Sequence, residues 1–329
     1  MTSGNNTTAA ADFDHLTPEL AIGLVEDALG VRLTSLHRPM NSYINRVYEM
    51  EREDGAFVIA KFYRPRRWSP EALQEEHDFL LELHEAEIPV IAPLRGSGGQ
   101  TLFSGGDMHF ALFEKKGGRI CDEPNDEQWR MLGRLLARTH QVGEQHPATH
   151  RITMSPSAIT RDQVEEILDS GLVAREHENT YAEVSHALVD LMSPLFDKDS
   201  FMRIHGDCHR QNMIHRPGEG FFIIDFDDMA MGPPVQDIWM LLPGRVDDAR
   251  RELNLLLEGY ELFRDFDDHS LRLVEPLRAM RFIHYTAWCA RQAADGGFTR
   301  LVPDWGSSTW WQQEIQALRE QHAHIAETL

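Results

Sequence analysis

The stretch of this 329-residue chain that most limits how it can fold is residues 201–228, FMRIHGDCHRQNMIHRPGEGFFIIDFDD. Two apolar runs flank the turn RPGEG, so we predict two antiparallel strands joined at that turn. With the centre of the turn placed between residues 218 and 219, Asn212 faces Asp225, and Asp207 brings a second carboxylate to the same open end. Three oxygen-bearing side chains therefore converge at one end of the hairpin.

The three side chains suit different tasks in one reaction. An amide oxygen and a carboxylate bind hard cations such as Mg²⁺, which proteins hold beside phosphate groups. A separate carboxylate accepts the proton of an attacking hydroxyl. The spacing from His205 through Asp207 to Asn212, followed by an apolar strand and Asp225-Phe226, is that of the catalytic loop and metal-binding aspartate of protein kinases. The hairpin therefore favours phosphoryl transfer.

Phosphoryl transfer in kinases also needs a strand lysine paired with a helix glutamate, and both have candidates upstream. The apolar run VIAK ends in Lys61, and the next predicted helix carries Glu75 and Glu76. Glu76 shares the helix face of Leu80 and Leu83, where an unpaired carboxylate would be costly. We therefore predict that Glu76 pairs with Lys61.

The pattern of elements divides the chain into two lobes. Residues 31–63 and 88–113 have strand character around one helix, and the remaining two-thirds is mainly helical apart from the hairpin. We predict an α+β fold of the bilobal protein-kinase type. A disordered tail at 1–14 precedes an N-lobe at 15–116, which holds an antiparallel sheet and one helix and binds the nucleotide. The helical C-lobe at 117–329 holds the catalytic hairpin and binds the acceptor.

Composition limits the partners and the compartment. Lys plus Arg number 32 against 53 Asp plus Glu, a net charge of −21, which opposes nucleic-acid binding. We interpret Arg64, Arg66 and Arg67 as a solvated loop. No apolar run approaches the ~18 residues that span a bilayer, and the three cysteines form no CxxC pair. We expect a cytoplasmic monomer without a membrane or nucleic-acid partner.

Several motifs together resemble a known family. The loop written His-Gly-Asp resembles the aminoglycoside-phosphotransferase and choline-kinase branch of the kinase-like fold. More narrowly, the motifs resemble the bacterial stress response kinase A group, which is described as Ser/Thr protein kinases. The motifs are NSYINRVY at 41–48, EEH at 75–77, GGR at 117–119, HGDCH at 205–209 and DFDD at 225–228.

The resemblance implies a role for each central residue. Asp207 would be the catalytic base, and Asn212 and Asp225 would bind Mg²⁺. Lys61 would contact the phosphates of ATP, and Glu76 would position Lys61.

The resemblance also implies how the rest of the nucleotide is bound. Because NSYINRV replaces a glycine-rich loop, Ser42 and Asn45 would cover the phosphates. Phe113 and Lys115 belong to the hinge whose backbone meets adenine. Asp237 would brace the catalytic loop.

Three classes of function stay open. The first is an ATP- and Mg²⁺-dependent phosphotransferase, acting on Ser/Thr of proteins or, alternatively, on a small aminoglycoside, choline or homoserine-like hydroxyl acceptor. An acidic C-lobe suits cationic acceptors. The second is a metal-dependent hydrolase with a cage of His205, Asp207, His209 and Asp225. The third is a nucleotide-sensing scaffold without catalysis.

Some residues of these motifs have more than one interpretation. We interpret His205 as a structural histidine, whereas His209 is open to contact with substrate. Asp227 and Asp228 are either solvated or lie beside the metal ligands. The tryptophans at 305, 310 and 311 are interpreted as C-terminal packing first and as a substrate wall second.

Overall fold

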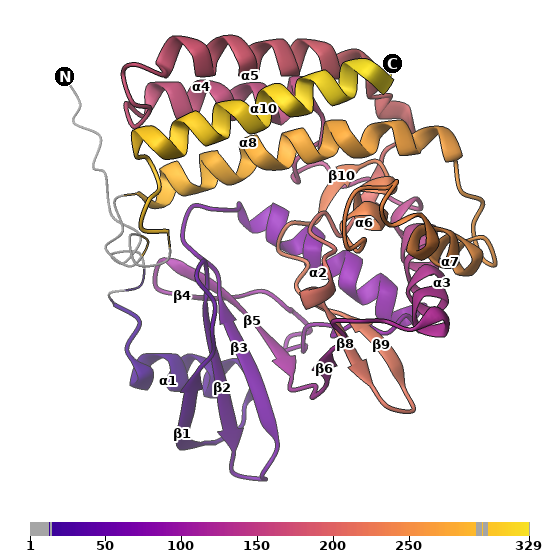
Figure 1. Ribbon diagram of the computed structural model, residues 1–329. Helices are drawn as coiled ribbons and strands as arrows, with labels where there is room; N and C mark the ends of the chain where they lie inside the picture. The colour runs from indigo at the N-terminus through magenta and orange to yellow at the C-terminus, as the bar shows by residue number, and fades with distance from the viewer. Residues whose placement is uncertain (1–12, 14, 294–297, 299–301, 329) are drawn as a thin grey trace.

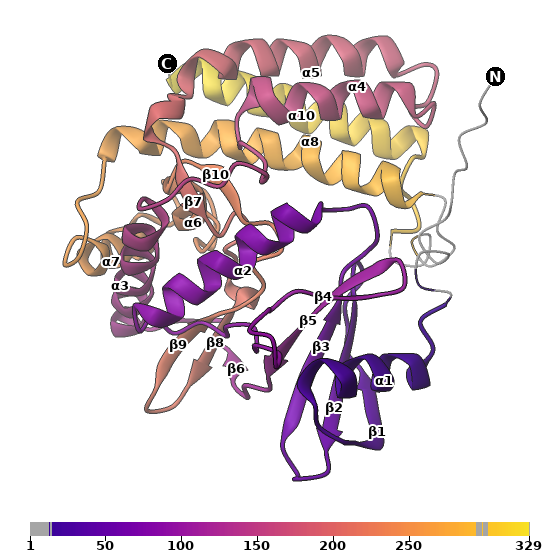
Figure 2. The same ribbon diagram turned by 180° about the vertical axis from the view of Figure 1, so that it is seen from behind.

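The computed structural model describes residues 13, 15–293, 298 and 302–328. An N-lobe built on a sheet lies below a larger, mainly helical C-lobe, and helix α2 (Pro70–Glu85) lies between them (Figures 1 and 2). The predicted α+β class is confirmed, as are the antiparallel sheet of the N-lobe and the mainly helical structure of the C-lobe. The lobe boundary at 116 and 117 stays a prediction.

The N-lobe is a five-stranded antiparallel sheet in the order β1-β2-β3-β5-β4. Helix α1 (Pro18–Leu29) packs on it, starting at an N-cap Thr17 that accepts a hydrogen bond from Leu20 N. Phe13, inside the predicted tail, is also buried in this core, whereas the other tail residues up to 14 lie outside the described residues. The strands are β1 (Leu33–Pro39), β2 (Arg46–Arg52), β3 (Phe57–Phe62), β4 (Phe103–Gly105) and β5 (Met108–Glu114).

The strand predicted at the start of 88–113 is wrong. Residues 88–94 form no strand, and only Val90 and Pro93 make isolated bridges, to Ile223 and Phe113. Pro89 and Pro93 lack the backbone N–H that a ladder requires, which explains why the segment crosses between the lobes instead of joining the sheet.

The C-lobe holds two buried cores, one around α3 and α7 and one among α4, α5, α8 and α10. Figure 1 shows the second group as a layer of helices that lie side by side along the top of the molecule. Trp311 is buried in it, as the packing interpretation predicted. The helices are α3 (Asp126–Gly143), α4 (Arg161–Asp169), α5 (Glu178–Met192), α6 (Val235–Trp239), α7 (Arg250–Tyr260), α8 (Val274–Gln292) and α10 (Ser308–Thr328).

The catalytic hairpin differs from its prediction by one residue. Strands β8 (Met213–Arg216) and β9 (Gly220–Ile223) form it, with β6 (Arg119–Ile120) beside β8, and Met213 pairs with Ile223. A tight turn closes it, since Glu219 N donates to Arg216 O and Gly218 has φ 84°. Asn212 therefore faces residue 224 instead of Asp225. The run before the loop, β7 (Met202–Ile204), pairs with β10 (Ala230–Gly232) instead.

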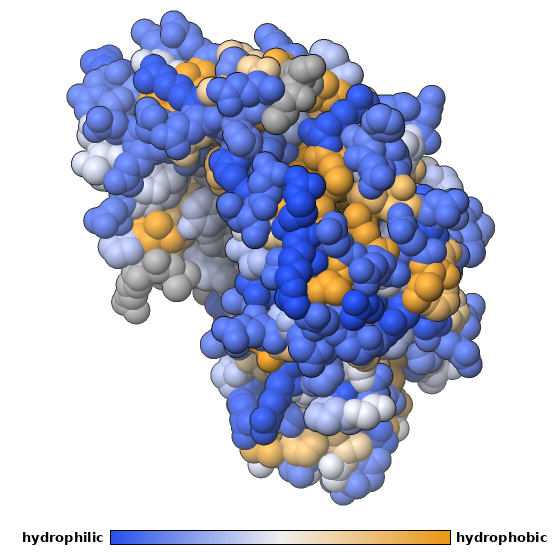
Figure 3. All heavy atoms as spheres, turned by 45° about the vertical axis from the view of Figure 1, so that its right-hand side comes forward, coloured by the Kyte–Doolittle hydropathy of each residue, from blue (hydrophilic) through white to orange (hydrophobic). Residues whose placement is uncertain are grey.

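The surface is consistent with the charged composition. Hydrophilic side chains cover most of the face in Figure 3, and apolar ones form smaller separate groups. Within the described ranges, none of the helices combines the length and the apolar character needed to cross a bilayer.

Candidate active site

The catalytic loop between β7 and β8 is held from below by Asp237 of α6. The Asp237 carboxylate accepts hydrogen bonds from the backbone N–H groups of His205 (2.8 Å) and Gly206 (2.9 Å), and lies 3.2 Å from His140 Nε2. Gly206 has φ 84°, and a Cβ there would lie 2.2 Å from Asp228 O. Only glycine fits this position. The bracing role expected of Asp237 is confirmed.

His205 has a structural role, as predicted. Its ring is fully buried, its Nε2 lies 2.9 Å from Ile224 O, and the ring packs against Phe226 at 4.6 Å between centroids. These contacts join the catalytic loop to the segment before Asp225. His205 therefore points away from the cleft.

Asp207 faces the cleft with both carboxylate oxygens engaged. Arg281 of α8 donates to Oδ1 at 2.8 Å, and His209 Nε2 lies 3.3 Å from Oδ2. Burial opposes ionisation of Asp207, but the hydrogen bond from His209 and the charge of Arg281 outweigh it and hold its pKa below the usual range. Asp207 is therefore ionised at neutral pH and able to accept a proton.

Asn212 and Asp225 lie side by side, although the register differs from the prediction. Ile224 N donates to Asn212 O at 3.0 Å, so Asp225 follows directly. Asn212 Nδ2 donates to Asp207 O at 2.9 Å, which commits the amide nitrogen and leaves the amide oxygen as the possible metal ligand.

Asp225 stands in a strained conformation at the cavity. Its φ is 63°, a left-handed conformation of the kind that costs on the order of 1–3 kcal/mol and clusters at functional sites. Its side chain is 52% exposed and lines the cavity. In the described part of the chain, no three His, Cys, Asp or Glu side chains are placed to hold an ion. The donor set of one amide and one carboxylate fits Mg²⁺, which fills its remaining positions with water and phosphate oxygens.

Lys61 and Glu76 come together as predicted, but each of them has a closer partner of opposite charge. Lys61 Nζ lies 2.5 Å from Asp227 Oδ1, 3.2 Å from Asp225 Oδ1 and 4.0 Å from Glu76 Oε1. Burial opposes the charge of Lys61, yet the carboxylates of Asp227, Asp225 and Glu76 raise its pKa well above the usual value. Lys61 is thus a fixed cation between β3 and the segment 225–228.

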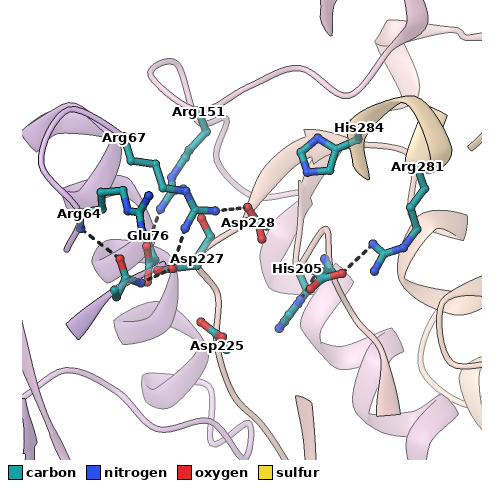
Figure 4. A network of polar contacts seen from close by, with 12 residues as sticks. Arg64, Arg67, Glu76, Arg151, His205, Asp225, Asp227, Asp228, Arg281 and His284 are labelled. Carbon is teal, nitrogen blue, oxygen red and sulfur yellow. Dashed lines mark hydrogen bonds and ion pairs between the residues drawn. The ribbon is translucent and has the colours of Figure 1, made fainter. Parts of the chain in front are cut away.

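The nearest partner of Glu76 is Arg151, which the sequence reasoning missed. The fully buried Arg151 side chain donates to Glu76 Oε2 (2.5 Å), Ala72 O (2.8 Å) and Asp227 O (2.8 Å). Arg151 therefore ties helix α2 to the segment 225–228 (Figure 4). It lies in a loop, 75 residues after Glu76, and no local pattern marks it.

Asp227 belongs to the site and is not solvated. Asn45 Nδ2 (2.5 Å) and Arg67 Nη1 (2.9 Å) donate to its Oδ2. Burial opposes ionisation, but Lys61 and Arg67 lower the pKa of Asp227 to about 2. Figure 4 shows Arg67 between Asp227 and Asp228. Arg67 Nη2 donates to Asp228 Oδ1 at 2.7 Å.

The interpretation of the arginines after β3 as a solvated loop is wrong for Arg64 and Arg67. Arg64 donates to Ile44 O (2.9 Å), Tyr43 O (3.1 Å) and, across the cleft, Gln292 Oε1 of α8 (3.0 Å). We name residues 41–45 the cover loop, because Arg64 holds this loop over the cleft. Such long-range contacts leave no periodic signal in a sequence.

Ser42 and Asn45 of the cover loop line the cavity with different freedom. The Asn45 amide is committed to Asp227 and to Arg64 N, which donates to Asn45 Oδ1 at 3.1 Å. Ser42 Oγ accepts from Asn45 N at 3.3 Å. Asn45 therefore fixes the shape of the cover loop, and contact of either residue with phosphates stays a prediction.

One cavity of about 960 Å³ lies between the lobes and joins these groups. Its apolar part is lined by Val47, Ile59, Phe113 and Ile223 from both lobes, a setting that suits a flat adenine ring. Lys115 also lines it, but its Nζ is 2.9 Å from Glu49 Oε2. Only the backbone of Lys115 is thus available for the hinge role.

The other end of the cavity is walled by helix α8. Arg281, His284, Tyr285 and Trp288 line it at the helical spacing of one face. Tyr43 of the cover loop packs edge-on against Trp288, with centroids 5.4 Å apart. The site thus has an apolar end, a charged centre with Lys61 and Asp207, and an aromatic end.

Comparison with known proteins agrees with this geometry. The sequence profile of the phosphotransferase enzyme family matches residues 37–274. Stress response kinase A of Salmonella paratyphi A is 37% identical over 316 residues, which cover 95% of this chain and 94% of that protein. A protein of Salmonella typhimurium called serine/threonine protein kinase RdoA is 36% identical, with the same shares covered.

A solved structure shows the same fold. Amicoumacin kinase hAmiN, in complex with AMP-PNP, Ca²⁺ and Ami, superposes with a TM-score of 0.73 at 19% identity, covering 97% of this chain and 95% of that one. The kinase-like bilobal fold predicted from the motifs is therefore confirmed. The chain belongs to the phosphotransferase enzyme family and, within it, to the stress response kinase A group.

Proposed function

We propose that the protein transfers the γ-phosphoryl group of ATP to a hydroxyl group, most directly a Ser or Thr of a protein. The observation that carries this proposal is that the carboxylate of Asp207 and the Lys61–Asp225 pair line one cavity. Adenine fits the apolar end of that cavity, and the phosphates then reach Lys61.

The residues present can do each part of the transfer. Asn212 and Asp225 would hold Mg²⁺, which neutralises phosphate charge when bound. Lys61 binds and orients the phosphates. The acceptor oxygen bonds to the γ-phosphorus as the bond from that phosphorus to the β–γ bridging oxygen breaks, and the hydroxyl proton goes to Asp207. Positioning supplies most of the rate.

The choice of a protein acceptor is supported by a relative. The protein named serine/threonine protein kinase RdoA matches 95% of this chain. A small hydroxyl compound is the second candidate, because the acceptor end is a recessed cavity between α8 and the cover loop instead of a flat surface.

The other two classes have less support. The ring of His205 is committed to Ile224 O, which removes one ligand from the proposed hydrolase cage. A scaffold without catalysis would have no need of an ionised Asp207 facing the cavity. Both classes predict no phosphoryl transfer.

The test is transfer of labelled γ-phosphate from ATP with Mg²⁺ to casein-like protein and to a panel of small hydroxyl compounds. We expect transfer by the natural enzyme and none by Asp207→Asn, which should still bind ATP in calorimetry. Undiminished transfer by Asp207→Asn would refute the assignment of Asp207 as the base that accepts the hydroxyl proton. Transfer to the small compounds alone would refute the protein acceptor.

A further inference from the structure

The aromatic end of the cavity contains a carboxylate that the phosphoryl-transfer step does not use. Glu314 of helix α10 lines the same cavity as Asp207. Thr286 of α8 donates to Glu314 Oε1 at 2.7 Å. Arg281, which contacts Asp207, lies five positions before Thr286 on α8, roughly 7.5 Å along the helix axis. Asp207 and Glu314 thus contact neighbouring turns of α8 and line one cavity, so an acceptor whose hydroxyl meets Asp207 would extend toward Glu314.

The carboxylate of Glu314 has no cation beside it, unlike the carboxylates at the charged centre of the cavity. Asp207, Asp227 and Glu76 line the same cavity, and each pairs with an arginine or a lysine. Across the described ranges, no Lys, Arg or His forms an ion pair with Glu314. A largely buried carboxylate without a counter-ion is unfavourable, so a cation bound from outside would gain the full attraction.

The groups that face Glu314 are neutral. Tyr285 and Cys289 lie on α8, and Tyr181 lies on α5. Burial raises the pKa of Glu314 to about 7, and the hydrogen bond from Thr286 only partly offsets it. A bound cation would favour the ionised form at neutral pH.

Aromatic rings complete the surroundings. Tyr285 stacks on Trp288, with centroids 5.9 Å apart and planes at 18°, and both line the cavity. Tyr43 meets Trp288 from the cover loop. The faces of such rings attract ammonium and guanidinium groups and repel anions.

We infer that Glu314, with Tyr285 and Trp288, binds a cationic group carried by the acceptor while the acceptor hydroxyl meets Asp207. This inference rests on the proposed function and narrows its acceptor class. An ammonium or guanidinium group suits the site whether it comes from a basic side chain near the Ser or Thr of a protein or from a small amino alcohol.

The experiment uses Glu314→Gln, which keeps the shape and the bond to Thr286 but removes the charge. The matched control is Glu320→Gln, on an exposed part of the same helix. Each enzyme receives two pairs of acceptors. One pair is a serine peptide with a nearby lysine and the same peptide with norleucine instead. The other pair is a linear amino alcohol and the diol of equal length.

We expect Glu314→Gln to lower kcat/KM about tenfold or more for the cationic member of one pair, mainly through KM. The uncharged member, the KM for ATP and the Glu320→Gln enzyme should be unaffected. The pair that responds identifies the source of the cation. An equal effect on charged and uncharged acceptors, or no effect on either, overturns the inference.

Binding without transfer separates this inference from the proposed function. Calorimetry should show that the natural enzyme binds the amino alcohol or the lysine peptide more tightly than its neutral partner, and that Glu314→Gln loses the difference. If no acceptor is phosphorylated but this preference exists, the proposed function fails and the cation site stands. If the natural enzyme shows no preference for a cation, the cation site fails, whatever is phosphorylated.

Discussion

Replacing Arg151 tests a fully buried connection of the active site. Arg151 is fully buried and donates to Glu76 and to the carbonyls of Ala72 and Asp227. Arg151→Met keeps much of the side-chain length but leaves the buried Glu76 with Lys61 alone, at 4.0 Å. The change therefore removes the cation and leaves the anion in place.

The expected cost follows from the burial of both partners. Removing one partner of a buried ion pair costs about 3–5 kcal/mol, because the remaining charge stays buried without compensation. The two carbonyl groups that lose a donor add about 1 kcal/mol each. Set against a total stability of about 5–15 kcal/mol, this is a severe loss. Adding Glu76→Gln removes the stranded charge and should restore at least about 2 kcal/mol.

Urea unfolding followed by tryptophan fluorescence gives the free energy of unfolding for both single variants and the double variant. The control is Arg161→Met, which breaks the exposed Arg161–Asp190 pair (2.7 Å) and should cost less than about 1 kcal/mol. The reasoning is refuted if Arg151→Met costs no more than the control, or if the double variant is as unstable as the sum of the single variants.

Three further changes probe the catalytic loop, the proposed metal ligand Asp225 and the half-buried acid Glu314. Gly206→Ala should inactivate and destabilise the enzyme, because its Cβ would meet Asp228 O at 2.2 Å; kinetics and thermal unfolding measure both effects. Asp225→Asn should abolish Mg²⁺-dependent transfer yet cost less than about 1 kcal/mol of stability, because asparagine tolerates a positive φ; a metal titration of activity and urea unfolding decide this. Glu314 has its pKa raised from 4.5 to about 7 in the folded state, so its neutral form is favoured there. Stability should be unaffected by this group below pH 4.5 and fall by about 3 kcal/mol as pH rises to 7. Glu314→Gln should remove that fall. If the free energy of unfolding has the same pH dependence in the natural protein and in Glu314→Gln, the prediction is wrong.

The sequence contains most of the site, because its central residues belong to local patterns. Lys61 ends an apolar strand, Glu76 shares a helix face with leucines, and Asp207 and Asn212 share one short loop. Each prediction needed only the period of one element and the order of elements along the chain. The structure brings these residues together around one cavity.

The arginines could not be predicted in the same way. Arg67, Arg151 and Arg281 reach their carboxylates across 160, 75 and 74 residues, and no helical or strand period records such contacts. The hairpin register was missed for a different reason, because the centre of the turn was placed half a residue too far along the chain. Symmetric pairing about Gly218, the middle residue of RPGEG, places Asn212 opposite Ile224, as the structure does.

The cover loop has a consequence for the order of events in a catalytic cycle. Arg64 fastens the loop to Gln292, and Tyr43 fastens it to Trp288, so both attachments end on α8. The cover loop and the aromatic end of the cavity therefore share one support. An acceptor lodged against Trp288 would hold the loop down and delay the departure of ADP. We expect the phosphorylated product to leave first and the nucleotide second, with the rate of loop opening limiting turnover at saturating acceptor.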